Sequence, residues 1–426
     1  MHSGMNTKFY IKILLMLSIA PLLSYNLFSQ TTFKWGRQFG SGREEYVMNH
    51  LVDSHGNLFV AGKTTGNLGG QNVGLNDGFL AKIDPDGNLL WIKQFGTEGD
   101  EDILWSAIDA SDCVYLTGST TGSLGAKNAG KEDIIIIKFD PDGKPLWSQQ
   151  IGTDSSDVGK GIYADNKGFL FVTGYTFGNL GINSKGNADG FVIKLDVNGN
   201  TSFAYQFGTP ENDMCNSITG RDGELYICGT TSGDLADKNK GFLDVFAGEL
   251  TDKGQLVRLT QFGSEGFDIP MDIKVDKDKN IYVGGTTSGN WGCQQLGEGD
   301  CFLTKINGRG EIQWVSQFGT KGHDGVRSIA INDRATDNIL VSGLIHLPPA
   351  NAFVRMLKKD GTTVWEKQIL NEGQSGDASG KCVTIDDNGI IYHVGLTGSD
   401  IFGNLKTGHG FYVVKLSLDH NLPAKK

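Results

Sequence analysis

The chain has 426 residues, and its 49 acidic and 38 basic side chains give a net charge of −11 at pH 7. A protein with this net negative charge repels phosphate backbones, so we expect no nucleic-acid partner. Hydrophobic residues make up 38% of the chain and aromatic residues 10%, which is enough apolar surface to exclude global disorder.

Residues 1–29 are typical of a secretory leader. Lys8 and Lys12 accompany an apolar stretch at 13–23 that is too short to span a bilayer. A cut after Ser29 fits the pattern, and an uncleaved membrane anchor is the alternative. No later segment is apolar over the length that a membrane-spanning helix needs. The sequence therefore predicts an exported protein, in the periplasm, at the cell surface or secreted, with no membrane span in its mature part.

The remainder, residues 30–426, is a tandem repeat. The tripeptide Gln-Phe-Gly, or a near-copy of it, recurs at intervals of about 56 residues. It begins at Gln38, Gln94, Gln150, Gln206, Gln261, Gln317 and Gln368. We therefore expect one domain of seven units. The units are approximately 41–96, 97–152, 153–208, 209–263, 264–319, 320–370 and 371–420, the last completed by 31–40.

Each unit repeats the same order of short apolar segments and turns. Asp-Gly and Gly-Asn turns separate the first segment from the second and the third from the fourth, and a long Gly- and Asn-rich loop separates the second from the third. This pattern, without helical periodicity, predicts four antiparallel strands per unit. In the first unit we expect them at 47–52, 58–62, 79–83 and 89–95.

Four strands of this length cannot bury both faces of their own sheet. Seven such sheets around one axis can, so the predicted fold is all-β, a seven-bladed β-propeller of four-stranded antiparallel blades. Residues 34–40 contain only the fourth strand of a unit, whereas the segment after Leu370 contains three strands and lacks the fourth. We therefore expect the N-terminal strand to complete the last blade and close the ring.

The repeated residues also resemble a known family. Residues 91–97, 114–118 and 189–196 are similar to the bacterial seven-bladed β-propeller repeat family called SBBP. The resemblance covers nearly all of 31–420, and it is weakest in the last two units, where 344–350 replaces the Gly-rich loop. It implies an exported repeat protein without an assigned activity. It brings no catalytic residues to this chain.

Two acidic series are expected on one face of the ring. If the first strand of each unit lines the axis, the hairpin turns lie on one face, and the long loops and blade crossovers lie on the other, which we call the loop-rich face. The first series follows each Gln-Phe-Gly: Glu45, Glu101, Asp157, Asp213, Asp268 and Asp324, with Asp377 as its seventh member. The second opens each third strand: Asp77, Asp133, Asp189, Asp244 and Asp300, followed by Asn351 and His409 in the last two units.

These residues provide the candidate site. The predicted binding residues are Asp157, Asp213, Asp268, Asp324, Trp291, which replaces a loop leucine, and His346, in the shortened loop of the sixth unit. Calcium is a possible cofactor, and its candidate ligands are Asp77, Asp133, Asp189 and Asp300. The alternative is structural: each carboxylate accepts backbone N–H groups and fixes a loop. No other cofactor is predicted.

Neither catalytic motifs nor cysteine spacing indicate an enzyme. The sequence lacks Gly-x-Ser-x-Gly, His-Glu-x-x-His and Cys-x-x-Cys. Of its six cysteines, Cys215 and Cys228 are expected to face each other across one hairpin, so this pair is the best candidate for a disulfide, and Cys293 and Cys301, which bracket one loop, are a lesser candidate.

The favoured function is a binding or scaffolding module that uses the loop-rich face. We expect a monomer that binds a protein or a glycan. One alternative is a polysaccharide-active hydrolase or lyase with an axial site, which would rest on analogy between folds. The other alternative is a purely structural envelope protein.

Overall fold

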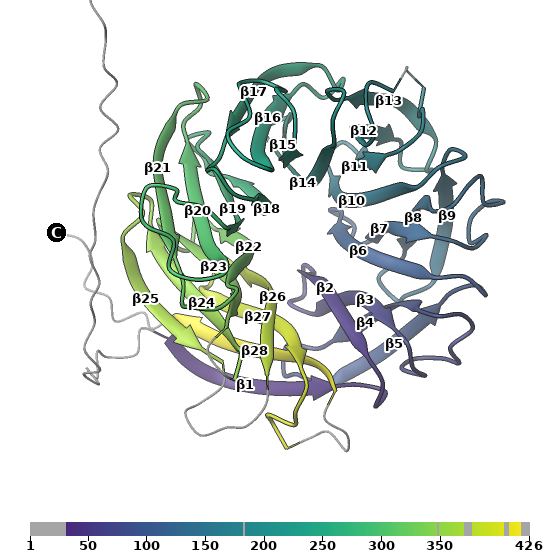
Figure 1. Ribbon diagram of the computed structural model, residues 1–426. Coiled ribbons are helices and arrows are strands. Elements are labelled where there is room, and N and C mark those ends of the chain that lie inside the picture. Colours follow the sequence, from purple (N-terminus) through teal and green to yellow (C-terminus); the bar gives the residue numbers. More distant parts are fainter. Residues whose placement is uncertain (1–30, 182–183, 347–348, 370–376, 404–408, 419–426) are drawn as a thin grey trace, which may run out of the picture.

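The computed structural model describes residues 31–181, 184–346, 349–369, 377–403 and 409–418. In these residues the chain forms 28 strands and no helix. Figure 1 shows seven antiparallel sheets of four strands arranged around a central opening. The prediction of an all-β, seven-bladed propeller is therefore confirmed. The predicted leader lies outside the described residues.

The strands follow the repeat. Blade 1 contains β2 (Glu45–Val52), β3 (Leu58–Thr64), β4 (Asp77–Ile83) and β5 (Leu89–Phe95). Blade 2 contains β6 (Glu101–Ile108), β7 (Val114–Thr120), β8 (Asp133–Phe139) and β9 (Pro145–Ile151). Blade 3 contains β10 (Asp157–Ala164), β11 (Leu170–Thr176), β12 (Asp189–Leu195) and β13 (Thr201–Phe207). Blade 4 contains β14 (Asp213–Arg221), β15 (Glu224–Thr231), β16 (Asp244–Leu250) and β17 (Leu256–Phe262).

The last three blades follow the same plan. Blade 5 contains β18 (Asp268–Val275), β19 (Ile281–Thr287), β20 (Asp300–Ile306) and β21 (Ile312–Phe318). Blade 6 contains β22 (Gly325–Ile331), β23 (Asn338–Ile345), β24 (Asn351–Lys358) and β25 (Thr363–Gln368). Blade 7 contains β26 (Ala378–Ile385), β27 (Ile390–Thr397), β28 (Gly410–Leu418) and β1 (Thr31–Phe39). No helix in the described ranges is long and apolar enough to cross a membrane.

The hydrophobic core lies between blades. In blade 1, β4 is buried at every position, whereas the outermost strand β5 has no buried residue. Seven clusters of buried apolar side chains form the core, and each cluster joins two adjacent blades. Both faces of the inner strands are therefore covered, which explains their continuous apolar sequences.

The N-terminal strand closes the ring. β1 pairs antiparallel with β28, from Thr31 opposite Leu418 to Phe39 opposite Phe411. It therefore occupies the outer position in the sheet order β1-β28-β27-β26, as Figure 1 also shows. The prediction that this strand completes the last blade is confirmed.

Adjacent blades are joined by a clasp at the turn between the third and fourth strands. Trp35 Nε1 and Lys415 Nζ of blade 7 both donate to the carbonyl of Pro85 in blade 1, at 3.1 and 2.7 Å. Gly87 of the same turn has a φ of +87°, and a β-carbon there would lie 3.1 Å from the Trp35 ring. The same contacts recur between later blades, for example where Trp314 donates to the carbonyl of Lys359. The repeated tryptophan therefore packs between blades.

Every innermost strand also contains one irregularity, a β-bulge. In blade 4 the bulge falls at Asn216, so Cys215 pairs with Gly229 and Ser217 pairs with Cys228. The predicted disulfide between Cys215 and Cys228 is therefore wrong, because one extra residue shifts the register between them. Cys215 packs in the cluster with blade 3 and Cys228 in the cluster with blade 5, and both are free thiols.

The clasp predicts a specific sensitivity at Gly143, which lies at the turn beside Trp91. Gly143 has a φ of +78°, and a β-carbon there would approach Trp91 to 2.7 Å, whereas Gly292, with a φ of +84°, has no neighbour within 4 Å. Both Gly→Ala changes strain the backbone, but only Gly143→Ala also overpacks the blade interface. We expect Gly143→Ala to lower the free energy of unfolding by about 1–3 kcal/mol more than Gly292→Ala, measured by denaturant titration. Equal losses in the two variants would contradict the clasp.

Candidate functional site

The first acidic series fixes the crossovers between blades. Asp213 is fully buried, and its Oδ2 accepts hydrogen bonds from the backbone N–H and the hydroxyl of Thr209, at 2.5 and 2.8 Å. The Asp213 N–H in turn donates to the carbonyl of Ala188 in the preceding blade, at 2.7 Å. The same buried arrangement is found at Asp157, Asp268 and Asp324. These four predicted binding residues therefore expose no surface through which to contact a partner directly.

The second acidic series acts with the glutamine of Gln-Phe-Gly to fix the long loops. Asp189 Oδ2 accepts hydrogen bonds from Gln206 Nε2 at 2.8 Å and from the Lys185 N–H at 2.7 Å. Gln206 Oε1 accepts the N–H of Leu180 at 3.0 Å, and its Nε2 donates to the carbonyl of Gly178. Equivalent glutamines hold Asp77, Asp133 and Asp300. In the sequence this glutamine marks the repeat, and its role in fixing the loop was not predicted.

The two series meet at the glycine of Gln-Phe-Gly. A β-carbon at Gly208 would lie 2.3 Å from Asp189 Oδ1 and 3.1 Å from Asp213 Oδ2, so only glycine fits between these carboxylates. One oxygen of each, Asp189 Oδ1 and Asp213 Oδ1, is buried without a hydrogen-bond partner. At the equivalent pair in the next blade, burial raises the pKa of Asp244 and of Asp268. Two adjacent buried carboxylates favour a retained proton or a bound cation.

Blade 7 has an alanine at the position where the other blades have the carboxylate of the first acidic series. Ala378 pairs with Thr397 in the register in which Glu45 pairs with Thr64, so Ala378 occupies the carboxylate position. Asp377 lies one residue earlier, is exposed, and accepts the N–H of Ala350 at 2.8 Å. The prediction of Asp377 as the seventh member is therefore wrong, because the residue opposite Thr397 in this blade is Ala378, one position later in the chain.

The other two predicted binding residues differ in exposure. Trp291 is half-buried, and its ring packs on Phe262 and Phe302 with centroid distances of 5.4 and 4.8 Å. The backbone N–H of Trp291 donates to Gln317 Oε1 at 2.9 Å, so this residue anchors its loop. The side chain of His346 is exposed, and its backbone N–H donates to Asp324 at 2.6 Å.

A pocket of about 310 Å³ lies on the axis and was not predicted from the sequence. It is lined by the second halves of the seven innermost strands, so it opens toward the hairpin-turn face and away from the loop-rich face. Its polar lining residues are Asn49, His50, Ser106, Tyr163, Thr219, Asp272, Lys274, Ser328, Cys382 and Thr384. Each blade supplies only one or two of them, at separations of about a repeat length, so no local motif marks the pocket. The available signal is that His50 and Ser106 stand where later blades have isoleucine or valine.

Hydrogen bonds run between neighbouring innermost strands around this pocket. Cys382 Sγ donates to Asn49 Oδ1 at 2.9 Å, and Asn49 Nδ2 donates to the carbonyl of Ser106 at 3.1 Å. On the other side, Asp272 accepts the N–H of Ile329 at 2.9 Å and pairs with Lys274 Nζ at 2.7 Å. The two bonds of Asn49 join blade 7 to blade 1 and blade 1 to blade 2. The bond from the Ile329 N–H to Asp272 joins blade 6 to blade 5.

Most of the polar side chains that line this pocket are uncharged. His50 is buried, its Nε2 lies 2.8 Å from Thr384 Oγ1, and burial lowers its pKa to about 3. His50 Nδ1 and Ser106 Oγ are buried without hydrogen-bond partners. Asp272 is the one carboxylate among the lining residues, so the pair of carboxylates that glycoside hydrolysis requires is not present in this lining.

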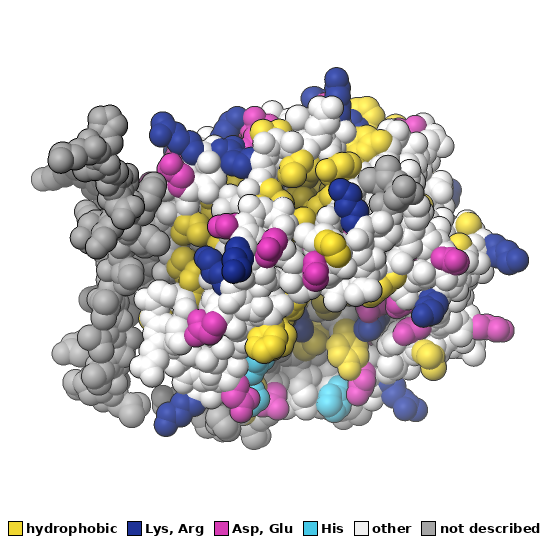
Figure 2. All heavy atoms as spheres, turned by 45° about the horizontal axis from the view of Figure 1, so that its top comes forward, with side chains coloured by type: hydrophobic (Ala, Val, Ile, Leu, Met, Phe, Trp, Pro, Cys, Tyr) yellow, Lys and Arg dark blue, Asp and Glu magenta, His cyan; other side chains and the backbone are white. Residues whose placement is uncertain are grey.

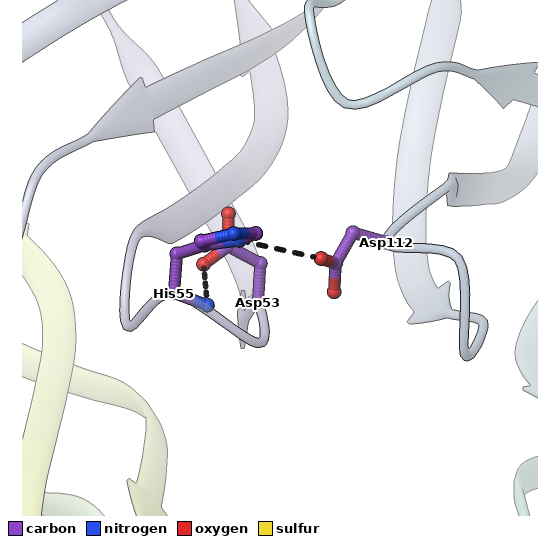
Figure 3. A group of neighbouring side chains, drawn as sticks. All are labelled: Asp53, His55 and Asp112. Carbon is purple, nitrogen blue, oxygen red and sulfur yellow. Dashed lines mark hydrogen bonds and ion pairs between the residues drawn. The ribbon is translucent and has the colours of Figure 1, made fainter.

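A second polar group lies on the hairpin-turn face, where Asp53, His55 and Asp112 bring their ligand atoms within 4.8 Å of one another (Figure 3). Asp53 accepts the backbone N–H of His55 at 2.9 Å and pairs with Lys82 at 3.3 Å. Asp112 accepts the hydroxyl of Ser54 at 2.6 Å and lies 3.6 Å from His55 Nδ1. Both carboxylates already accept hydrogen bonds from protein donors. The group therefore serves to connect the turns of blades 1 and 2 by hydrogen bonds and does not need a metal ion for this.

Buried histidines predict loss of stability in mild acid. His50 and His393 are both buried, and burial lowers the pKa of each to about 3, so both are neutral when folded. The unfolded chain binds more protons below its histidine pKa of about 6.5, so stability falls as the pH drops below that value. We expect the free energy of unfolding to fall by on the order of 2 kcal/mol per histidine between pH 7 and pH 5.

Unfolding free energies at pH 7, 6 and 5 measure this effect. The variant His50→Gln is expected to lose about half of the pH dependence that the two histidines cause. His55→Gln is the matched control, because the His55 side chain is 79% exposed. The same pH dependence in the parent and in His50→Gln would show that His50 is not buried in its neutral form.

Known repeats and curated proteins match parts of the chain. Residues 34–69 and 146–181 match the SBBP beta-propeller repeat. The regulatory protein FlaEY of Caulobacter vibrioides is 25% identical over 186 residues, which cover 39% of this chain and 19% of that protein. An uncharacterized WD repeat-containing protein, L264, of Acanthamoeba polyphaga mimivirus is 24% identical over 182 residues, or 33% of this chain and 13% of that protein. The chain thus spans a fifth or less of the length of these relatives.

Solved structures show similarity in fold alone. A polysaccharide lyase of family PL25, an ulvan lyase, is 10% identical with a TM-score of 0.51, covering 88% of this chain and 95% of the lyase. Drosophila Plexin A, solved with Semaphorin 1b, is 9% identical with a TM-score of 0.50, covering 92% of this chain and 88% of the plexin. The repeat matches and the seven blades confirm the resemblance found in the sequence: the chain is a seven-bladed β-propeller protein with SBBP repeats.

Proposed function

We propose that the protein is an exported binding module whose loop-rich face docks a protein partner. The observation that carries the proposal is a set of large apolar side chains exposed on that face. These are Tyr46, Val73, Leu75, Phe177, Phe242, Phe267, Ile269 and Leu296. Exposed apolar side chains in mutual contact favour an interaction surface, and Phe242 and Phe267 of this set are in contact. Figure 2 shows hydrophobic side chains reaching the surface of the protein, with charged side chains dispersed among them.

An aromatic pair is the strongest feature of this set. Phe242, in the long loop of blade 4, and Phe267, in the crossover to blade 5, stack with centroids 4.8 Å apart and planes 9° apart. The side chains remain 67% and 46% exposed. Ile269 follows Phe267 at the start of β18 and is also exposed. Rigid aromatic residues with aliphatic neighbours are typical of the energetic centres of protein interfaces.

The backbone beneath this pair is held in place. The Phe242 N–H donates to the carbonyl of Gly266 at 3.1 Å, and the Phe267 N–H donates to Ser288 Oγ at 2.8 Å. Asp268 fixes the same crossover through Ser264. Because these loops are already ordered, they would lose less conformational entropy when a partner binds. The buried acidic residues thus support the surface without contacting the partner.

The apolar character of the set favours a protein over a glycan. The stacked rings cover one face of each other, which leaves less open ring surface for a sugar. Aliphatic side chains such as Ile269 and Leu296 offer no hydrogen bonds to hydroxyl groups. A protein partner with an apolar patch matches both features.

The two alternatives have weaker support. A polysaccharide-active enzyme would use the axial pocket, where Asp272 is already paired with Lys274. The likeness to the ulvan lyase extends only to the fold. A purely structural role would give no reason for an exposed phenylalanine pair.

Substitution of the aromatic pair tests the proposal. The double variant Phe242→Ser and Phe267→Ser is compared with the double variant Leu90→Ser and Leu146→Ser, whose side chains are similarly exposed on outer strands. A protein captured from envelope extracts by the parent chain is purified, and its affinity for each variant is measured by titration calorimetry. We expect at least tenfold weaker binding to the phenylalanine variant and unchanged binding to the leucine variant. The reverse pattern, with binding lost only in the leucine variant, would reject the loop-rich face.

Calcium is a second proposal, favoured by the carboxylate oxygens that lack partners. Asp133 Oδ1, Asp189 Oδ1 and Asp300 Oδ1 are buried without a hydrogen-bond partner, and such oxygens suit Ca²⁺. If Ca²⁺ binds there, replacing EDTA with millimolar calcium raises the melting temperature, because the ion binds only the folded chain. Asp189→Asn should reduce this rise, whereas Asp196→Asn, at an exposed turn, should not. An unchanged melting temperature in the parent would exclude calcium.

A further inference from the structure

Each of the innermost strands, which together line the axial pocket, contains one bulge residue. The bulge residues are Met48, Leu104, Lys160, Asn216, Met271, Arg327 and Lys381. Arg327 and Lys381 occupy adjacent blades, on β22 and β26, which lie side by side at the central opening in Figure 1. The residues that directly follow them, Ser328 and Cys382, line the axial pocket.

These two cations have no acidic partner. Among the residues that the structure describes, neither Arg327 nor Lys381 forms an ion pair with a carboxylate. Arg327 Nε is buried without a hydrogen-bond partner, and the guanidinium otherwise contacts Met271 Sδ at 3.7 Å, a weak acceptor. Burial lowers the pKa of both groups, and the nearby Arg327 charge contributes to lowering that of Lys381 to about 8.

Other cations near the axis are compensated. Lys274 pairs with Asp272 at 2.7 Å, and Lys63 pairs with Asp102 at 3.1 Å. Lys160 stands at the same bulge position as Arg327, and the carboxylates of Asp102 and Glu132 partly offset the effect of burial on its pKa. The pair in blades 6 and 7 therefore differs from its neighbours in lacking a counter-charge.

Two neighbouring cations withdrawn from water without a counter-charge are unfavourable, because burial removes hydration and like charges repel. An anion between them would correct both effects. We propose that Arg327 and Lys381 form a binding site for an oxyanion, a carboxylate, sulfate or phosphate group, at the wall of the axial channel. The guanidinium offers a planar fork of N–H donors, and the ammonium adds a mobile point charge.

The adjoining pocket extends the site for a larger anion. Its volume of about 310 Å³ and its partly exposed polar lining residues, such as Thr219 and Lys274, suit a small body that carries hydroxyl groups. A simple oxyanion would use only the cation pair, whereas a hydroxylated organic anion would use both parts. This site is independent of the proposed protein-binding face.

Methionine substitutions test the site with little change in packing. Met48 and Met271 occupy the same bulge position in blades 1 and 5, so Arg327→Met and Lys381→Met place a residue that this position already accommodates. Lys160→Met is the matched control. Melting temperatures are measured at pH 7 and constant ionic strength in chloride, sulfate, phosphate, acetate and glucuronate. In chloride we expect the Arg327 and Lys381 variants to be at least as stable as the parent, because each has lost a partly buried charge that had no acidic partner.

The expected result is a rise in the parent's melting temperature with at least one oxyanion relative to chloride. This rise is retained in Lys160→Met and lost in Arg327→Met and in Lys381→Met. A larger rise with glucuronate than with acetate assigns the ligand to the hydroxylated organic class, and equal rises assign it to simple oxyanions. Equal stabilisation of the parent and both variants would mean a general salt effect and would overturn the proposal. Titration calorimetry of sulfate into the parent provides a second measurement, and absence of binding by every probe would also overturn it.

Discussion

Trp35 and Lys415 both donate hydrogen bonds to the carbonyl of Pro85, and this contact joins the last blade to the first. Trp35 belongs to β1, at the start of the described chain, whereas Lys415 belongs to β28, near its end. The same strand that completes blade 7 therefore also clasps blade 1. Each blade has two apolar faces, so an open ring would leave two of them exposed to water. Every other feature of the molecule, including the axis and the order of its loops, depends on this closure.

Closure alone would leave long, mobile loops on one face, and the repeated Gln-Phe-Gly segment prevents this. Its glutamine bonds the long loop and a third-strand carboxylate, and its glycine leaves room for that carboxylate and the one that fixes the crossover. In Gln206-Phe207-Gly208 these roles come from consecutive residues. In blade 4, Gln261 holds the long loop that carries Phe242, so this side chain is presented in a fixed position on the loop-rich face.

The fold could be predicted from the sequence because it is encoded by repetition, turn residues and strand-length apolar segments, each of which is local. The bulges could not be predicted in this way. The extra residue Asn216 offsets Cys215 from Cys228, and the register of β26 puts Ala378 in the place assigned to Asp377. The acidic series was found in the sequence, but its burial depends on how crossovers fold back on the preceding blade. The axial pocket was missed because each blade contributes only one or two of its polar residues.

Departures from the repeat carry the most information about function, because residues that recur in every blade serve the shared scaffold. His50 and Ser106 replace isoleucine or valine beside the axis, and Arg327 and Lys381 place charges at a bulge position where blades 1 and 5 have methionine. Each replacement is unfavourable for a buried position unless another group contacts it. An identical repeat would give a symmetrical, largely apolar channel wall. The asymmetry of this channel therefore favours a ligand at blades 6, 7, 1 and 2, while the exposed phenylalanine pair distinguishes blades 4 and 5 on the loop-rich face.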